Sequence, residues 1–188
     1  MSPEPDSAAM LRLQAGDDLA LNELMDRWRT RVISYLIRMV SSQTTAVDLA
    51  QETFVRVYSS RLSYRPSATF STWLFAIATN LARHHLRWQR RHPAVSLDDP
   101  VDGEALHDRL PSASGTPSGD AVKSEQAIAV KKAIGDLPQD LREAVILFEY
   151  EGMSHAEIAA VVGCSAKAVE TRLYRARQIL RQKLRFLL

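Results

Sequence analysis

The chain has 188 residues, a formal net charge of +2 at pH 7, and a composition with no unusual bias, so it is long enough for one ordinary domain or two small ones. No apolar run approaches the roughly 20 residues needed to cross a bilayer, and the N-terminus lacks a signal-peptide pattern. The single cysteine, Cys164, excludes an internal disulfide. We therefore expect a cytoplasmic protein without membrane insertion.

The N-terminal part of the chain predicts a short tail followed by helices. Residues 1–9 are polar and contain two prolines, so we expect them to be disordered. Apolar residues then recur at helical spacing over 17–40 and again over 45–59. The second of these helices carries Asp48, Gln51 and Glu52 on its outer face. On most helices such a group is only a solvated face.

A loop and a long helix follow. Pro66 interrupts helical structure in residues 64–69, and a helix is predicted for 71–91. One face of that helix is distinct from its apolar face and passes from aromatic to cationic along Trp73, Ala76, Asn80, Arg83 and Arg87. A single-stranded base needs a flat ring to stack on and a cation for its phosphate. From the residues alone, a core tryptophan with surface arginines explains this stripe equally well.

Residues 93–121 have the composition of a linker. They contain four prolines, three glycines and six acidic residues against one arginine. A compact domain rarely contains so long a loop without secondary structure, so the chain is predicted to have two helical domains, 10–92 and 122–188, joined by a flexible acidic linker.

The C-terminal domain is predicted to have four helices, over 122–135, 138–150, 154–163 and 165–184. The last two form a helix-turn-helix: Ser154 and Glu157 make a capping box, Gly163 ends the first helix, and Ser165 caps the second. The second helix is basic. A solvated amphipathic helix closing a bundle is the alternative, but the turn and capping pattern favours the helix-turn-helix.

The order of three segments resembles a known family. DLAQETFVRVY, FSTWLFAIATNLARHHLRWQRR and LPQDLREAVILFEYEGMSHAEIAAVVGCSAKAVETRLYRAR together resemble the bacterial sigma factors, and more narrowly the extracytoplasmic function (ECF) group of the sigma-70 family. The resemblance implies an all-α transcription initiation factor with sigma regions 2 and 4. Such a factor binds core RNA polymerase and directs it to promoter DNA, and an anti-sigma factor is a further implied partner.

The resemblance also implies three sets of site residues. Core polymerase would be bound by Asp48, Leu49, Gln51 and Glu52. The promoter's minus-ten element would be held by Tyr64, Arg65, Phe70, Trp73, Asn80, Arg83 and Arg87. The minus-thirty-five element would be read by Ala166, Lys167, Glu170, Thr171, Arg172, Tyr174, Arg175 and Arg177.

Two other functions would require features that the sequence does not show. A response-regulator-type activator carries a similar helix-turn-helix, but its alternating strand and helix receiver domain is not visible in the sequence. An enzyme is not expected, because the five histidines lack a metal-ligand spacing, no glycine-rich phosphate loop occurs, and no nucleophile has an evident base. We accordingly expect no cofactor, no metal and no small-molecule substrate.

Overall fold

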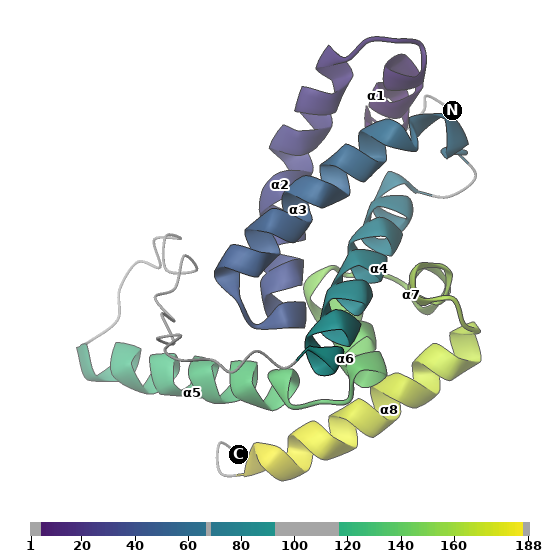
Figure 1. Ribbon diagram of the computed structural model, residues 1–188. Coiled ribbons are helices and arrows are strands. Elements are labelled where there is room, and N and C mark those ends of the chain that lie inside the picture. The colour runs from purple at the N-terminus through teal and green to yellow at the C-terminus, as the bar shows by residue number, and fades with distance from the viewer. Residues whose placement is uncertain (1–4, 67–68, 93–116, 186–188) are drawn as a thin grey trace.

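The computed structural model describes residues 5–66, 69–92 and 117–185, and every regular element in these ranges is helical (Figure 1). The N-terminal half contains α1 (Pro5–Gln14), α2 (Leu19–Val40), α3 (Gln43–Ser59), the 3-10 turn η1 (Arg61–Ser63) and α4 (Phe70–Arg91). The C-terminal half contains α5 (Pro117–Gly135), α6 (Gln139–Val145), the π-helical turn η2 (Ile146–Tyr150), α7 (His155–Val162) and α8 (Ala166–Lys183). The predicted all-α class is confirmed for the described residues.

The predicted disordered tail is wrong for residues 5–9, which form the first half of α1; residues 1–4 lie outside the described part of the chain. Ala9, Met10 and Leu13 are fully buried. The polar residues of this helix also have partners: the Trp28 Nε1–H donates to Asp6 Oδ2 at 2.9 Å, and Ser7 Oγ lies 3.0 Å from the Tyr64 hydroxyl. These distant partners order a segment whose composition alone indicates disorder.

Helices α2, α3 and α4 enclose the N-terminal core. Trp28 meets Phe70 and Phe75 edge to face, with ring centroids 6.0 Å and 6.1 Å apart. The hydroxyl groups of Tyr35 and Thr79 lie 2.7 Å apart and form a buried hydrogen bond.

Two helices begin slightly earlier than predicted. Ser42 caps α3 by accepting from the Thr45 amide, and Thr69 caps α4.

The C-terminal half contains the predicted helix-turn-helix. Ser154 and Glu157 form the expected capping box, Gly163 has φ +74°, and Ser165 accepts from the Ala168 amide at 3.2 Å. Two other predictions need correction. Residues 117–121, assigned to the linker, belong to α5, and the predicted helix 138–150 changes to π-helical geometry at Ile146. The remainder of the predicted linker, 93–116, lies outside the described residues.

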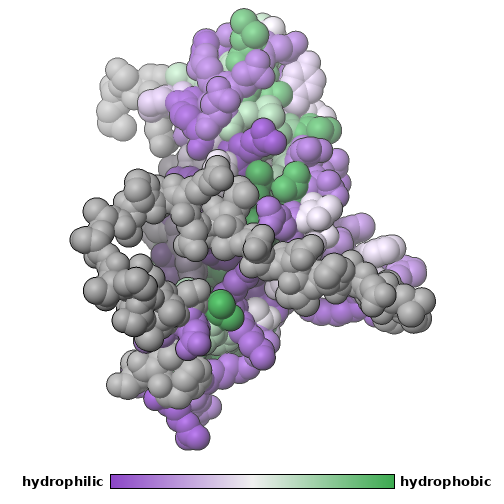
Figure 2. Space-filling model, turned by 90° about the vertical axis from the view of Figure 1, so that its left-hand side faces the viewer, coloured by the Kyte–Doolittle hydropathy of each residue, from purple (hydrophilic) through white to green (hydrophobic). Residues whose placement is uncertain are grey.

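The two halves pack against each other. In Figure 1, α7 lies beside α4, and α5 and α8 lie across the end of the molecule toward which α4 points. One cluster of buried apolar residues runs from Ala9 in α1 to Ala176 in α8. On the face shown in Figure 2, the described surface is mostly hydrophilic, with hydrophobic residues in small separate patches. Within the described ranges, none of the helices combines the length and apolar character that a membrane span needs.

Candidate nucleic-acid interface

Helix α8 is anchored by one face and presents the other to solvent. Val169, Leu173 and Ala176 are buried, as their helical spacing predicts. The opposite face begins at Ala166 and carries exposed Lys167, Glu170, Thr171, Tyr174 and Arg175. A groove-reading helix needs one face of its first turns accessible, and here that face is exposed to solvent.

Polar contacts within the start of α8 hold the side chains of Lys167, Glu170 and Thr171. Lys167 Nζ donates to Glu170 Oε2 at 2.8 Å, and the Thr171 hydroxyl donates to the Lys167 carbonyl at 3.0 Å. The hydrogen bond and charge of Lys167 lower the pKa of Glu170, so this carboxylate is ionised at neutral pH. An ionised carboxylate repels phosphate but accepts a hydrogen bond from a cytosine amino group.

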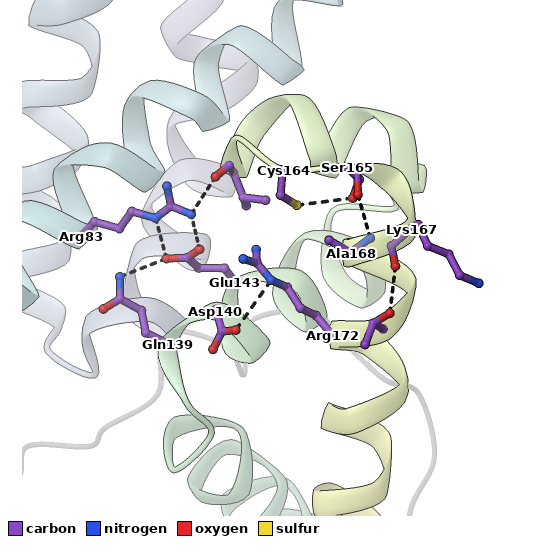
Figure 3. A network of polar contacts seen from close by, with 11 residues as sticks. Arg83, Gln139, Asp140, Glu143, Cys164, Ser165, Lys167, Ala168 and Arg172 are labelled. Atoms are coloured by element: carbon purple, nitrogen blue, oxygen red, sulfur yellow. Dashed lines mark hydrogen bonds and ion pairs between the residues drawn. The ribbon is translucent and has the colours of Figure 1, made fainter.

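Two of the predicted minus-thirty-five arginines have structural partners. Arg172 is only one-quarter exposed and lies 3.6 Å from Asp140 of α6 (Figure 3). Arg177 pairs with Glu149 at 3.1 Å, and its guanidinium lies 5.3 Å from the centre of the Phe148 ring. Arg172 therefore fastens α8 to α6, and Arg177 fastens it to η2, a role that the sequence pattern did not distinguish from DNA contact.

The aromatic end of the α4 stripe is supported from below. Trp73 is half-buried, and its ring meets the rings of Tyr64 and Phe70 at centroid distances of 5.3 Å and 6.3 Å. Tyr64 and Phe70 themselves are 1% and 0% exposed. The expectation that these two rings face a promoter base is not met in this conformation, because both belong to the core; they brace Trp73 instead.

The cationic end of the same stripe borders a cavity of about 600 Å³. Exposed Asn80 and Arg87 line it, together with Arg56, His84, Arg90 and Gln139 among other residues. Arg65, in the loop before α4, is exposed and donates to the carbonyls of Leu62 and Tyr64. Asn80, Arg87 and Arg65 are therefore accessible cations and polar groups on the same side of the chain as the cavity or in the loop before α4.

Arg83, in the middle of this stripe, is not free. Its Nε and Nη2 atoms donate to the two carboxylate oxygens of Glu143 at 2.8 Å and 2.5 Å, and Nη2 also donates to the Val162 carbonyl at 3.2 Å (Figure 3). Glu143 is 1% exposed and raises the pKa of Arg83 through these hydrogen bonds. Glu143 was not predicted as a site residue, because nothing in its sequence neighbourhood distinguishes it from a solvated glutamate.

Helix α3 presents the third predicted set. Asp48 and Gln51 are exposed, while Glu52 accepts from Arg56 at 2.8 Å. Leu49 is half-buried and packs against the core, so it supports the helix more than it forms its outer face. The structure adds Val55, one turn further along, which is 59% exposed. Val55 follows Gln51 by four positions and Glu52 by three, and this helical spacing from two polar surface residues was the available signal for it.

Sequence comparison identifies the family to which this chain belongs. Residues 24–92 match the model of sigma-70 region 2, and residues 127–180 match the model of sigma-70 region 4. The chain therefore belongs to the sigma-70 family of transcription initiation factors, which direct RNA polymerase to promoters through these two regions and are not enzymes. The response-regulator alternative does not account for region 2.

Within that family the chain is a sigma factor of the ECF group. It is 35% identical to the ECF RNA polymerase sigma-E factor of Haemophilus influenzae, with 95% of each chain covered. It is also 32% identical to the RNA polymerase sigma-H factor of Pseudomonas aeruginosa, over 100% of this chain and 98% of that protein.

Two solved structures share the arrangement of helices. CnrH, solved in complex with the cytosolic domain of CnrY, matches with a TM-score of 0.71 and 27% identity over 96% of this chain and 97% of that one. The sigma factor RpoE of Bartonella quintana, solved with the anti-sigma factor NepR, matches with a TM-score of 0.66 at 24% identity, covering 87% of this chain and 96% of that one. The second likeness concerns the fold alone.

Proposed function

We propose that three surfaces divide the work of this sigma factor: α3 binds core RNA polymerase, the α4 stripe holds the minus-ten element, and the start of α8 reads the minus-thirty-five element. The observation that carries the proposal is the free, polar first half of α8 on a completed helix-turn-helix. The functional domains are proposed to span 10–92 and 122–188, with α1 packed onto the first.

For the minus-thirty-five element, the residues proposed to reach base edges are Lys167, Glu170, Thr171 and Arg175, with Ala166 and Tyr174 beside them. They are exposed and lie in the first half of α8, where a recognition helix contacts the major groove. Arg172 and Arg177 are proposed to approach the phosphate backbone at most, because each is held by a carboxylate.

For the minus-ten element, Trp73 is proposed as the stacking platform, since it is the accessible ring of its aromatic cluster. Asn80 and Arg87 are exposed and are proposed to contact the strand, together with Arg65 from the loop. Arg83 joins them when its carboxylate partner is withdrawn. Tyr64 and Phe70 are proposed to act through Trp73, by holding its ring in place.

For core polymerase, Asp48, Gln51 and Glu52 are proposed to form the contact surface on α3, with Leu49 holding that helix against the core. Support comes from their exposure and from the absence of any packed helix over their face in the described ranges. The chain is proposed to act in the cytoplasm, where polymerase and promoter DNA are found. An anti-sigma factor is also proposed as a partner, by analogy with the complex of CnrH and the cytosolic domain of CnrY.

The test is transcription with purified components. Core RNA polymerase freed of other sigma factors is mixed with the chain and a pool of promoter-length DNA, and the transcript starts are sequenced. We expect initiation at a small set of sites that share two motifs, and loss of initiation with Asp48→Ala and Gln51→Ala together. Random start sites, the same with and without the chain, would reject the assignment.

A further inference from the structure

We propose that the cavity at the junction of α3, α4 and α6 is a binding site for a small oligophosphate, a chain of a few linked phosphate groups. The cavity lies beside the α4 stripe and shares Asn80 and Arg87 with it. A small anionic ligand is a partner of a different kind from promoter DNA and core polymerase, and its binding does not depend on the functions proposed above.

The walls of the cavity are cationic. Arginines from two helices line it: Arg56 from α3, and Arg83, Arg87 and Arg90 from α4. Among the described residues, no aspartate or glutamate lines it. Like charges gathered around one space repel each other, and an anion that enters this space is attracted by all of them.

Two of these arginines have no carboxylate partner in the described part of the chain. Arg56 and Arg83 already pair with glutamates. By contrast, Arg87 is exposed and forms no ion pair in that part of the chain, and Arg90 donates to the neutral amide oxygen of Gln139 at 3.1 Å. The guanidinium groups of Arg87 and Arg90 are therefore available to a ligand, and a guanidinium binds phosphate through two parallel N–H···O hydrogen bonds.

A further cation lies near Arg90. Arg142 donates to the carbonyls of Met39 and Leu137 at 2.8 Å and 3.1 Å, so its guanidinium is fixed in place. Burial lowers the pKa of Arg142, and the charge of Arg90 lowers it further. Arg90 therefore stands in a region of positive potential, which favours an anion at the adjoining cavity.

The size and the lining of the cavity indicate which phosphate ligand it suits. Its volume of about 600 Å³ is that of a small-molecule site. A chain of phosphates can contact cations of both helices at once, and the side-chain amides of Asn80 and Gln139 supply further donors. No tryptophan, tyrosine or phenylalanine of the described ranges lines the cavity, so it has no such ring on which a base could stack. Recognition therefore falls on the phosphate chain, and neither a nucleotide base nor a single strand of DNA is required.

Isothermal titration calorimetry with inorganic tripolyphosphate tests the site in the full chain. The buffer contains EDTA and physiological salt, so that neither divalent cations nor weak surface attraction contributes. We expect saturable binding of one tripolyphosphate per chain, and binding of sulfate weaker by about tenfold or more, since sulfate cannot contact both helices. Absence of saturable binding, or equal affinity for the two anions, would overturn the proposal.

Four variants then locate the bound anion. Arg87→Gln and Arg90→Gln each remove charge-assisted hydrogen bonds, and each should weaken tripolyphosphate binding by about tenfold. Arg56→Gln should also weaken binding, which would show that α3 contributes to the site. The matched control is Arg91→Gln, which removes the same charge from an exposed position next to Arg90 outside the lining, and should change the affinity by less than about twofold. Equal losses in Arg90→Gln and Arg91→Gln would reduce the effect to general attraction and reject the site.

The substituted arginines are all exposed, so the variants should fold, and thermal unfolding checks this. A short single-stranded oligodeoxynucleotide is titrated against the same variants. If Arg87→Gln and Arg90→Gln weaken the binding of this DNA but not of tripolyphosphate, the cavity serves nucleic acid and the proposal is wrong. Because the titrations use neither polymerase nor promoter, their outcome is separate from that of the transcription assay.

Discussion

The most informative single substitution is Trp73→Ala. Trp73 is half-buried, braced by Tyr64 and Phe70, and is the accessible ring of the α4 stripe. Stacking of one base on an aromatic ring contributes about 1–3 kcal/mol, which corresponds to roughly 5- to 150-fold in affinity. Removing the ring should weaken binding of a single-stranded minus-ten oligonucleotide by that factor, while Trp73→Phe, which keeps a ring, should retain most of the affinity.

The assay uses holoenzyme, which is the form proposed to bind promoter DNA. Fluorescence anisotropy gives the dissociation constant for the single-stranded oligonucleotide and, separately, for a duplex carrying only the minus-thirty-five element. The parent, Trp73→Ala and Trp73→Phe holoenzymes should bind this duplex with equal affinity. Thermal unfolding of the free chain measures the stability that is lost with the Trp73 ring. Trp28→Phe, which changes a core ring that is only 8% exposed, provides the matched control. A lower melting temperature with unchanged affinity for the single strand would show that Trp73 is a core residue only.

Four other predictions concern base recognition, polymerase binding, core packing and helix capping. Glu170→Ala should relax discrimination at one base pair by about 1–3 kcal/mol, and equal discrimination across a set of single-pair variants of the duplex would contradict this. Asp48→Ala should weaken binding to core polymerase severalfold in a competition assay without changing the melting temperature; an unaltered dissociation constant would remove it from the interface. Leu173→Ala should cost about 2–5 kcal/mol of unfolding free energy, since this fully packed side chain joins α8 to its neighbours, and denaturant titration checks it. Glu157→Ala should cost about 0.5–1 kcal/mol at pH 7 and less near pH 3.5. Hydrogen bonds from Ser154 lower the pKa of Glu157, so its contribution is present above the pKa of an unfolded carboxylate and is lost as the pH falls through the lower folded value; a difference independent of pH would refute this.

Local patterns were sufficient for the helix-turn-helix. The capping box of Ser154 and Glu157, the left-handed Gly163 and the cap at Ser165 are each determined by residues within four positions of one another. Such short-range hydrogen bonds form in the same way whatever the rest of the chain does. The three buried residues of α8 follow from helical spacing for the same reason.

Burial within the candidate sites was harder to predict. Trp73, Tyr64 and Phe70 are close in sequence and similar in type, yet only Trp73 remains accessible. The difference arises because α1 and α2 supply the partners Ser7 and Trp28, which cover the other two rings. Periodicity identifies the inward face of one helix, but it does not indicate which helix covers a residue at the edge of that face.

By itself, the sequence determined the helical class, the positions of most helices, the turn between α7 and α8, and the family, because these depend on spacing, caps and the order of motifs along the chain. Only the tertiary structure decided that residues 5–9 are ordered, that Arg172 and Arg177 fasten α8, and that Arg83 binds Glu143. Each of these depends on a pair of charged, polar or aromatic groups far apart in the chain, and the energy of such a pair is set by burial and geometry that no local pattern encodes.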